Sequence, residues 1–347
     1  MKIAIAWYGL PYYAARCIAE SIRLNPGVEF SIISTQVGVP YEGIDDLVGG
    51  HVHWIAEECS VAWSDLGGVP DLFITTSWSH KSYMGLAKEA KAGGRTRIVS
   101  MVDNFYIGTS KQWLGALYFR IILRHIFDLM WVPGARGTRF MRFLGMPSAR
   151  IVTGLYAADT DIFYPPDDLG NVRKGVVFVG QFIPRKGVHE IVDALQSVDG
   201  EKYRDWLRLI GHGPLLNEIK ALGLRVEEFK QPRQLGDVYR SADALLLPSK
   251  IDHWGVVAHE AALCGCLILA TRQCACVDDL VTHEVNGYIM SNSSSDEILA
   301  ALTWLDGRTC AEKELGRLHS IERAAAFSPK RWAETLKKII LDCGIKS

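Results

Sequence analysis

The sequence predicts an α/β protein built from two Rossmann-like domains with parallel sheets. Short runs rich in Val, Ile, Leu and Phe alternate with longer amphipathic runs, which is the pattern of β-α-β units. A length of 347 residues favours two domains, at about 150 residues each. Hydrophobic residues make up 48% and charged residues 22% of the chain, which excludes a disordered, collagen-like or coiled-coil protein.

The expected elements fall into two series separated by a linker. The strands expected in the first series cover residues 2–7, 29–34, 72–76, 97–102 and 151–153. Residues 159–174 are rich in Pro, Asp and Gly and show no periodicity, which is typical of a linker. The strands expected in the second series cover 175–179, 207–210, 225–229, 244–247 and 267–270. We therefore predict domains over 1–165 and 166–327, and a C-terminal helix over 328–347 that packs back toward the first domain.

The charges are unevenly distributed along a chain whose net charge is −1. Residues 80–150 contain 12 Lys and Arg against 3 Asp and Glu, whereas residues 1–79 contain 3 against 9. The near-neutral total and the lack of a nucleic-acid-binding motif argue against a nucleic-acid partner. The basic segment suits an anionic acceptor or an anionic membrane surface.

Cysteine usage and hydropathy place the chain in the cytoplasm. No run of 18 apolar residues is present, and the apolar N-terminal run is too short for a signal peptide. Eight cysteines are too few for a disulfide framework in a chain of this length, so we expect free thiols. The spacing of the Cys264/Cys266 and Cys274/Cys276 pairs, with one residue between partners, does not favour zinc. We expect these four thiols to pack as small apolar groups.

Three glycine-containing segments follow predicted strands of the second series, at 180–187, 211–214 and 248–260. Ligands of open parallel sheets bind at the carboxyl ends of the strands, where glycine-containing loops and helix N-termini can bind phosphate through backbone N–H groups. The third segment also holds two carboxylates, Asp252 and Glu260. Such a segment would bind a nucleotide diphosphate sugar: the helix start would bind the phosphates, one carboxylate the sugar hydroxyls, and the other, two turns into the helix, the ribose.

The order of four runs resembles the donor domain of glycosyltransferase family 4. They are VVFVGQFIPRKGVHEIVDAL, LIGHGPL, DVYRSADALLLPS and DHWGVVAHEAALCGCLILAT, and the resemblance extends over about residues 150–330. It implies the GT-B fold, in which two Rossmann-like domains face an interdomain cleft, and an enzyme of the O-antigen or exopolysaccharide type. It also implies sugar transfer from a nucleotide diphosphate donor with retention of configuration and without a metal or other cofactor.

The resemblance assigns roles to individual residues. Glu260 stands at the ribose-binding position, Lys186 at the diphosphate-binding lysine and Asp252 at the first motif glutamate, one methylene shorter. Gln181 stands where the family has an arginine, and we hypothesise that Arg185 replaces that charge. The implied donor-binding set is Gly180, Gln181, Arg185, Lys186, Gly211, Gly213, Phe229, Asp252, His253, Trp254, Gly255, Val256, Val257 and Glu260.

In the first domain the resemblance is looser. Gly9, Leu10 and Trp78 are the implied acceptor-side residues, and His80 and Asp103 join Lys186 and Asp252 as catalytic candidates. The alternative for His80 is a helix cap or surface residue, and for Asp103 an ordinary loop acid.

Residues 111–131 (KQWLGALYFRIILRHIFDLMW) predict a helix that carries Arg120 and Arg124 on one face. One interpretation is an interfacial helix on anionic lipid, giving peripheral contact with the inner membrane face. The other is a mostly buried helix with one charged edge.

The resulting hypothesis is a retaining, metal-independent hexosyltransferase that uses a UDP-sugar and a saccharide or lipid-linked acceptor in cell-surface polysaccharide synthesis. Two alternatives remain, a sugar-nucleotide epimerase or hydrolase of the same fold and a non-catalytic nucleotide-sugar-binding partner. An NAD-dependent dehydrogenase is disfavoured because neither half has Gly-x-Gly-x-x-Gly between a strand and a helix.

Overall fold

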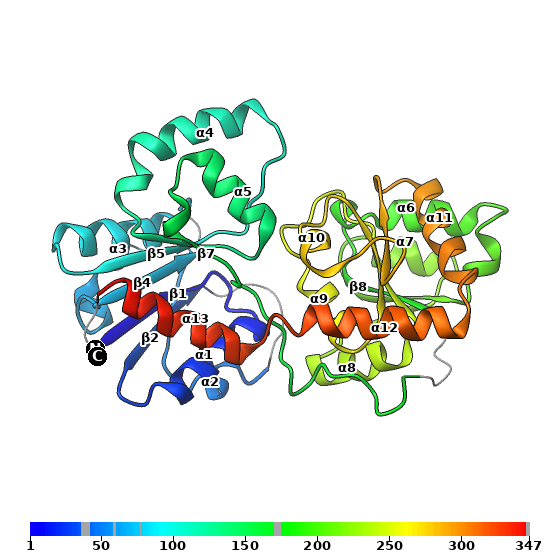
Figure 1. Cartoon of the computed structure of the whole chain (residues 1–347), viewed down its shortest axis with the longest axis horizontal. Coiled ribbons are helices and arrows are strands. Elements are labelled where there is room, and N and C mark those ends of the chain that lie inside the picture. Colours follow the sequence, from blue (N-terminus) through cyan, green and yellow to red (C-terminus); the bar gives the residue numbers. More distant parts are fainter. Residues whose placement is uncertain (36–41, 58–59, 77, 170–174, 345–347) are drawn as a thin grey trace. The chain divides into compact units, whose positions relative to one another are not determined.

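The computed structural model describes residues 1–35, 42–57, 60–76, 78–169 and 175–344, which form two compact units (Figure 1). Unit 1 comprises Met1–Ala157 and Phe327–Ser347, and unit 2 comprises Ala158–Ala326. The chain therefore enters unit 2 eight residues earlier than the predicted boundary. The first part of the expected linker packs in unit 2, where Ile162 and Phe163 are buried and the Ile162 carbonyl accepts from Arg240 Nη1 at 3.0 Å. A Pro- and Asp-rich composition did not reveal these two anchors. Residues 170–174 of that linker lie outside the described residues.

Unit 1 contains a seven-stranded parallel sheet in the order β3-β2-β1-β4-β5-β6-β7. Its strands are β1 (Lys2–Ala6), β2 (Glu29–Thr35), β3 (Val52–Ile55), β4 (Leu72–Thr76), β5 (Arg97–Met101), β6 (Leu129–Trp131) and β7 (Ile151–Val152). Its helices are α1 (Tyr12–Leu24), α2 (Ile44–Leu47), α3 (Lys81–Ala92), α4 (Ser110–Ile121), α5 (Ala135–Leu144) and α13 (Pro329–Asp342). Short 3-10 turns are η1 (Trp63–Leu66), η2 (Leu123–His125) and η3 (Ser148–Arg150).

Both faces of this sheet are covered, as buried parallel strands require. One apolar cluster lies between the sheet and helices α1 and α13, and the other lies against α3, α4 and α5. The C-terminal helix α13 therefore belongs to unit 1. Its Trp332 stacks on Trp131 with ring centroids 4.5 Å apart and donates Nε1–H to the Leu155 carbonyl.

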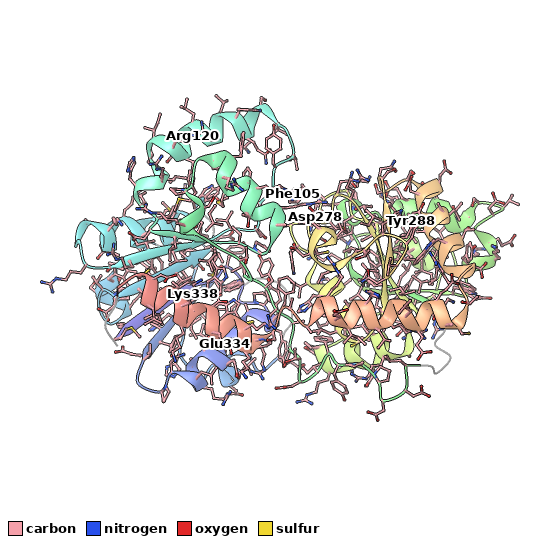
Figure 2. The ribbon with its side chains drawn as sticks, viewed as in Figure 1. Phe105, Arg120, Asp278, Tyr288, Glu334 and Lys338 are labelled. Carbon is pink, nitrogen blue, oxygen red and sulfur yellow. The ribbon has the colours of Figure 1, made fainter. Side chains whose placement is uncertain are left out.

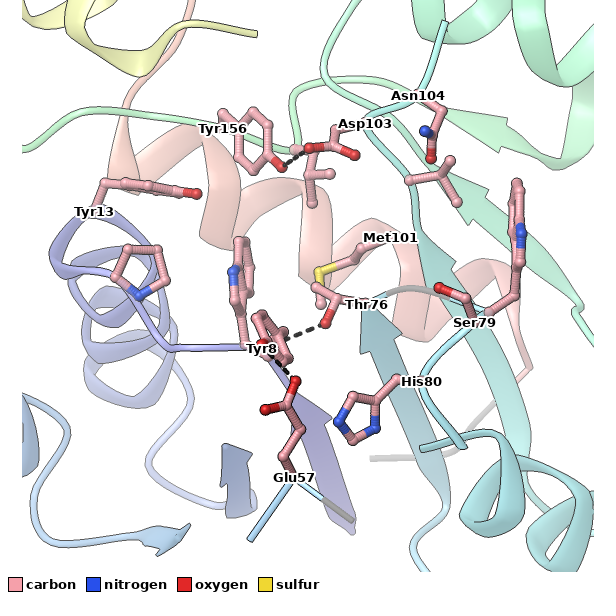
Figure 3. Close-up of a pocket in the computed structure, with 15 residues that line it drawn as sticks. Tyr8, Tyr13, Glu57, Thr76, Ser79, His80, Met101, Asp103, Asn104 and Tyr156 are labelled. Atoms are coloured by element: carbon pink, nitrogen blue, oxygen red, sulfur yellow. Dashed lines mark hydrogen bonds between the residues drawn. The ribbon is translucent and has the colours of Figure 1, made fainter. Parts of the chain in front are cut away.

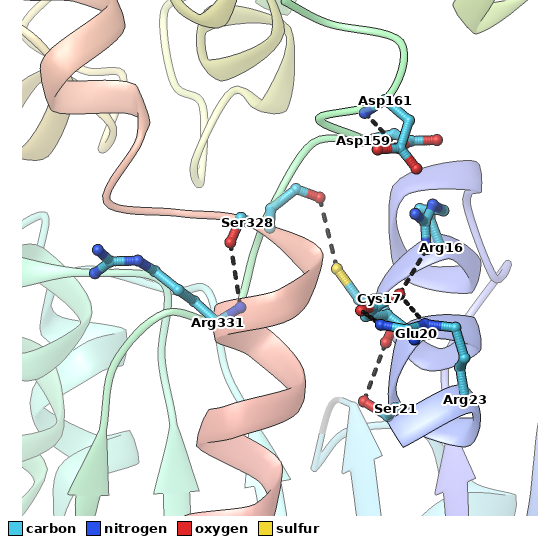
Figure 4. Close-up of polar contacts among 10 residues, drawn as sticks. Arg16, Cys17, Glu20, Ser21, Arg23, Asp159, Asp161, Ser328 and Arg331 are labelled. Atoms are coloured by element: carbon cyan, nitrogen blue, oxygen red, sulfur yellow. Dashed lines mark hydrogen bonds and ion pairs between the residues drawn. The ribbon is translucent and has the colours of Figure 1, made fainter. Parts of the chain in front are cut away.

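Polar contacts fix the ends and exposed edges of these two helices (Figure 4). The Ser328 hydroxyl caps α13 by accepting from the Arg331 N–H, a contact that satisfies one of the free amides at a helix start. On α1, Glu20 accepts from Arg23 at 2.6 Å and also pairs with Arg16. The hydrogen bond from Arg23 is the main reason that the pKa of Glu20 lies below its usual value.

Unit 2 contains a six-stranded parallel sheet in the order β10-β9-β8-β11-β12-β13. Its strands are β8 (Val176–Gln181), β9 (Leu207–His212), β10 (Val226–Glu227), β11 (Ala244–Leu247), β12 (Leu267–Thr271) and β13 (Gly287–Met290). Its helices and 3-10 turns are η4 (Pro184–Lys186), α6 (Val188–Gln196), η5 (Glu201–Tyr203), α7 (Leu216–Ala221), α8 (Pro232–Ser241), α9 (Val256–Leu263), α10 (Val277–Leu280), α11 (Ser295–Asp306) and α12 (Cys310–Ala324).

These two parallel-sheet units confirm the predicted α/β class. The expected strands at 72–76 and 244–247 are confirmed to the residue. The sequence analysis missed β3, β6 and β13, which have only three or four residues each.

The helix expected over 111–131 is wrong. Helix α4 ends at Ile121, the turn η2 follows, and Leu129–Trp131 form strand β6. Arg120 and Arg124 therefore do not share one helix face. The interpretation of a mostly buried helix is also wrong, because only Ala116 and Phe119 of α4 are buried. Within the described residues, no helix combines the length and the apolar character needed to cross a bilayer.

Candidate functional site

The carboxyl ends of β9, β8 and β11 lie side by side in unit 2, since these strands are neighbours in the sheet. The chain runs outward from β8 to β9 and β10 and then returns to the other side of β8 as β11. A sheet opens a crevice where its strand order reverses in this way, and ligands of open α/β sheets bind there. The three glycine-containing segments singled out in the sequence follow these three strand ends.

Two glycines allow the loops at this edge to approach one another closely. Gly187 has φ +75°, and a Cβ there would lie 2.1 Å from the Pro248 carbonyl oxygen. Gly213 has φ +150°, and a Cβ would lie within 2.6 Å of the Phe182 backbone. Side chains at these positions would separate the segments after β8, β9 and β11.

Lys186 and Asp252 form an ion pair across the β8–β11 crevice. The Lys186 Nζ lies 2.5 Å from Asp252 Oδ2, and the same oxygen accepts from the Ser249 hydroxyl at 3.5 Å. Both charged side chains are largely buried, with exposed fractions of 15% and 10%. The structure therefore brings together the two catalytic candidates that the sequence placed in this unit.

Arg185 and Gln181 have different surroundings in the crevice. The Arg185 guanidinium donates to the Ile251 carbonyl at 2.8 Å, and the Arg185 carbonyl accepts from the Lys250 N–H. This pair of contacts ties turn η4 to the loop after β11. Gln181 ends β8 and is exposed. Replacement of the missing positive charge by Arg185 stays a hypothesis.

Helix α9 begins in this crevice. Its N-cap Gly255 has φ +78°, and the helix starts at Val256 and Val257. Free N–H groups and the helix dipole make such a start favourable for an anion. Glu260 is the fifth residue of α9 and lies just over one turn into the helix, where the sequence analysis expected two turns.

Glu260 is partly buried, and the Tyr239 hydroxyl donates to its Oε2 at 3.3 Å. Burial raises the pKa of Glu260 to about 7, and the hydrogen bond from Tyr239 opposes that shift. The carboxyl group keeps one oxygen for a further partner. When ionised, its two oxygens can accept hydrogen bonds from the hydroxyls of a diol.

Other residues of the predicted donor set lie in the same segments. His253 is partly buried and Trp254 is 2% exposed between Asp252 and Gly255. Phe229 follows β10 and meets His212 edge to face at 5.9 Å between ring centroids. Gly180 and Gly211 face each other in neighbouring strands, and a Cβ on Gly211 would lie 1.9 Å from the Gly180 carbonyl oxygen.

The sequence analysis did not single out His259, which directly precedes Glu260. Its side chain is fully buried, Nδ1 accepts from the Ala158 N–H at 3.0 Å, and Nε2 lies 3.0 Å from the Ala324 carbonyl. Burial lowers the pKa of His259 to about 4, so the ring is neutral and Nε2 carries the proton. His259 holds the first and last segments of unit 2 together.

The four cysteines near α9 pack among apolar groups. Cys264, Cys266, Cys274 and Cys276 are free thiols with no exposed surface. Cys266 donates to the Tyr239 carbonyl at 3.1 Å. In the part of the chain that the structure describes, no three His, Cys, Asp or Glu side chains are grouped to hold a metal ion. Cys59 lies outside the described residues.

Unit 1 has a pocket of about 590 Å³ at the reversal of its own strand order, between β1 and β4 (Figure 3). It is lined by Trp7, Tyr8, Pro11, Tyr13, Glu57, Thr76, Trp78, Ser79, His80, Met101, Val102, Asp103, Asn104, Leu155 and Tyr156. The candidates Trp78, His80 and Asp103 therefore share one pocket. Gly9 and Leu10 are not among its lining residues. Leu10 is 1% exposed and packs in the core, so its side chain is not available to an acceptor.

His80 caps α3 and also lines the pocket. Its Nδ1 accepts from the Tyr83 N–H at 3.4 Å, which is the cap that the sequence analysis offered as the alternative. Its Nε2 is buried with no partner among the described residues. Burial lowers the pKa of His80, so the neutral ring is favoured.

Tyr8, Glu57 and Tyr156 are among the pocket residues that the sequence analysis did not assign. The Tyr8 hydroxyl donates to Glu57 Oε1 at 2.9 Å, and the Tyr156 hydroxyl donates to Asp103 Oδ2 at 3.0 Å (Figure 3). Burial raises the pKa of Tyr156 well above its usual value, so it remains a donor. Glu57 follows the short strand β3, which itself was missed, and Tyr156 follows β7. Their position after strand ends was the one sequence feature that could have marked them as pocket residues.

Comparison with known proteins bears on both units. Residues 169–307 match the family model of the glycosyl transferases group 1. This match covers most of unit 2. A GDP-mannose-dependent α-(1-6)-phosphatidylinositol monomannoside mannosyltransferase of Mycobacterium tuberculosis is 25% identical over 251 residues, 63% of each chain. A D-inositol 3-phosphate glycosyltransferase of Nocardiopsis dassonvillei is 23% identical over 85% of this chain and 69% of its own. A glycosyltransferase of Methanocaldococcus jannaschii without an assigned activity is 26% identical, and the chain spans only 43% of its length.

Solved structures resemble the whole chain in fold. The HepE protein of Anabaena, in complex with UDP and glucose, has a TM-score of 0.74 at 15% identity, covering 99% of this chain and all of that one. Sucrose-phosphate synthase of Thermosynechococcus elongatus has a TM-score of 0.74 at 15% identity over the full length of both chains. These structures confirm the GT-B fold that the sequence resemblance implied.

Proposed function

We propose that the chain is a retaining glycosyltransferase that needs no metal and moves a hexose from a nucleoside diphosphate to a saccharide or lipid-linked acceptor. One observation carries this proposal. Lys186, Asp252 and the start of α9 converge on the β8–β11 crevice of a group 1 domain, and Glu260 follows one turn into that helix. The set suits a diphosphate, a sugar and a ribose in that order.

The donor would bind mainly through groups already placed in the crevice. The N–H groups at the start of α9 would donate to the diphosphate oxygens, and the Glu260 carboxylate would accept from the ribose hydroxyls. We propose UDP as the nucleotide, and the support is that HepE is described with UDP and glucose. GDP is the competing base, since the mycobacterial relative is named as GDP-mannose-dependent.

In the proposed reaction an acceptor hydroxyl attacks the anomeric carbon on the face that the diphosphate leaves. The new C–O bond forms as the bond between the anomeric carbon and the phosphate oxygen breaks, and the hydroxyl proton passes to the departing phosphate. Lys186 would neutralise the charge that develops on that phosphate. Asp252 holds Lys186 before the donor arrives and would accept from a hydroxyl of the donor sugar once Lys186 turns to the phosphate.

The unit 1 pocket suits an uncharged, hydroxyl-rich part of the acceptor. Its described lining contains the carboxylates of Glu57 and Asp103 and several aromatic rings, but no Lys or Arg. Carboxylates accept hydrogen bonds from hydroxyls, and aromatic faces pack on sugar rings. The basic residues of segment 80–150 lie outside this lining, so the pocket does not fit an anionic acceptor group. We place the reaction in the cytoplasm, where the thiols of unit 2 stay reduced.

A thermal-shift panel tests the donor site first. UDP, GDP, ADP, dTDP and NAD are added separately, each with and without EDTA. We expect one nucleoside diphosphate to raise the melting midpoint equally in both conditions, because saturation at about 100 times Kd adds roughly 2.7 kcal/mol. A response to NAD alone, or to no nucleotide, would overturn the donor assignment.

Turnover then separates the transferase from its alternatives. Release of the nucleoside diphosphate should depend on an acceptor, and NMR should show the anomeric configuration of the donor retained in the product. Acceptor-independent release would indicate a hydrolase or epimerase. Binding without any turnover across an acceptor panel would indicate a non-catalytic partner.

A further inference from the structure

We propose that one face of unit 1 docks on the surface of an anionic lipid bilayer. This face, here called the α4 face, consists of Tyr106, Ile107, Trp113, Leu114, Leu117, Tyr118, Ile121 and Ile122. The proposal concerns where the protein binds and does not depend on the donor, acceptor or reaction proposed above.

Exposed apolar side chains are concentrated on the α4 face. Eight of the eighteen large hydrophobic side chains that are exposed among the described residues fall within residues 106–122. Leu114 is 72% exposed, Ile121 62% and Trp113 58%. Scattered exposed hydrophobics are ordinary, whereas a contiguous group of them marks an interaction surface.

Helical geometry places these side chains on one stripe. At about 100° per residue, Trp113, Leu114, Leu117, Tyr118 and Ile121 fall within an arc of about 140°. The two buried residues of α4, Ala116 and Phe119, point to the opposite side of the helix. Figure 1 shows α4 on the outside of unit 1, with α5 between it and the sheet.

Hydrogen bonds hold the face in place. Thr109 caps α4 by accepting from the Gln112 N–H, and the Gln112 amide bridges back to the Phe105 carbonyl and the Ile107 N–H. Arg120, labelled in Figure 2, donates to the Phe143 and Leu144 carbonyls at the end of α5. The apolar stripe is therefore presented by a fixed helix.

The segment that carries the stripe is rich in positive charge. Residues 104–150 contain seven Lys and Arg and a single acid, Asp128. That acid already pairs with Lys91 at 3.0 Å and with Arg97 at 3.4 Å. Lys111, Arg124, Arg139 and Arg142 are exposed. Basic residues beside an apolar stripe match the headgroups of anionic lipids.

The same charges argue against a second copy of the chain as the occupant. A twofold contact would place the α4 face against itself, and the basic residues of both copies would then repel one another. The helix of 12 residues spans about 18 Å, which is too short to cross a bilayer, so it would lie in the plane of the surface. Trp113 and the two tyrosines suit the headgroup region, because such rings have an apolar body and a polar tip.

Vesicle flotation tests the proposal with the full chain. We expect binding to vesicles of phosphatidylcholine with phosphatidylglycerol and weak binding to pure phosphatidylcholine. We also expect release at about 0.5 M salt, which shortens the Debye length to roughly half its value at 0.1 M. The variant L114E/L117E should lower the partition coefficient by about tenfold or more. Its matched control is L315E/L318E, which changes two exposed leucines with the same spacing on α12.

A second pair of variants separates charge from apolar contact. K111E/R124E should reduce binding to the anionic vesicles, and K337E/K338E, on two exposed lysines of α13, should not. All four variants should keep the nucleotide-induced thermal shift, which also shows that they fold. Equal loss in test and control variants, or no vesicle binding by the parent chain, would overturn the proposal. So would a parent dimer in analytical ultracentrifugation that L114E/L117E converts to monomer.

Discussion

The Lys186 ammonium is held by the Asp252 carboxylate in a largely buried setting. A phosphate in the same crevice would compete for this ammonium, so the charge is in place before the leaving group needs it. In the proposed reaction its effect would belong to the transition state, in which the phosphate charge grows, more than to ground-state binding.

We predict that K186A lowers kcat by about 100-fold or more and changes the Kd of the nucleoside diphosphate by only a few-fold. Single-turnover kinetics and calorimetry measure the two quantities. K250A, on an exposed lysine that pairs with Glu190, is the matched control. Because Asp252 loses its partner in K186A, the double variant K186A/D252N shows whether a buried charge alone explains the loss. Equal effects on kcat and Kd would contradict the prediction.

Glu260 gives a pH-dependent prediction. Its pKa of about 7 in the folded chain lies above the unfolded value of 4.5, so its contribution to stability is fully present below pH 4.5 and is lost as the pH rises through 7. E260Q should therefore gain about 2–3 kcal/mol of stability relative to the parent between pH 5 and pH 8. Urea unfolding at both pH values measures this difference.

The control for E260Q is E228Q, which changes an exposed glutamate of the same unit. E260Q should also weaken nucleotide binding, because the amide replaces one acceptor oxygen with a donor. A stability difference that is the same at pH 5 and pH 8 would show that Glu260 is not the titrating group.

At the scale of elements, the site depends on how closely three loops approach one another. Gly187 joins turn η4 to helix α6 and lies directly against Pro248. Gly223 has a similar φ of +69°, but a Cβ there would meet nothing within 4 Å. Comparing alanine substitutions at the two glycines therefore distinguishes the free-energy cost of a left-handed backbone from the cost of a clash at the close approach.

We predict that G187A destabilises the chain by about 2–4 kcal/mol and abolishes the nucleotide-induced thermal shift, whereas G223A costs about 1 kcal/mol and preserves it. Thermal unfolding with and without the nucleotide gives both results. Similar losses in the two variants would mean that only the backbone conformation matters.

The sequence predicted elements well where a short strand is apolar and buried along nearly its whole length, as at 72–76 and 244–247. It failed for β6, whose three residues continue an apolar run that also contains α4. The sequence analysis grouped Lys186 with Asp252 through the order of the motifs. The ion pair itself depends on the pairing of β8 with β11, which brings the loops after these strands together. Glu57 follows β3, which the sequence analysis missed, whereas Tyr156 follows the predicted strand at 151–153 but was not singled out. His259 carried no local signal of its two long-range partners.

At the scale of the whole molecule, the chain passes between its units twice, at 157/158 and at 326/327. His259 holds Ala158 and Ala324, close to both passages, within unit 2. Helix α13 completes the core of unit 1 through Trp332 and Leu336, which are 1% and 0% exposed.

We predict that L336A destabilises unit 1 by about 2–5 kcal/mol, because it leaves a cavity under α13. L341A, on a leucine of the same helix that is 68% exposed, should cost about 0.5 kcal/mol or less. Differential scanning calorimetry should show the loss in L336A, and nucleotide affinity should stay within about twofold, since the donor site lies in unit 2. A matching loss of nucleotide affinity would show that the donor site depends on this core.

The discontinuity of unit 1 also sets an order of events during synthesis. Unit 2 is a single continuous segment, so its sheet can close as soon as residue 326 has left the ribosome. Unit 1 begins first but must wait for residues 327–347, and until then the apolar cluster around Trp131, on which Trp332 stacks, stays uncovered. The half of the chain that is translated first is therefore the half that finishes folding last, and a nascent chain stalled before Phe327 would expose that cluster to chaperones.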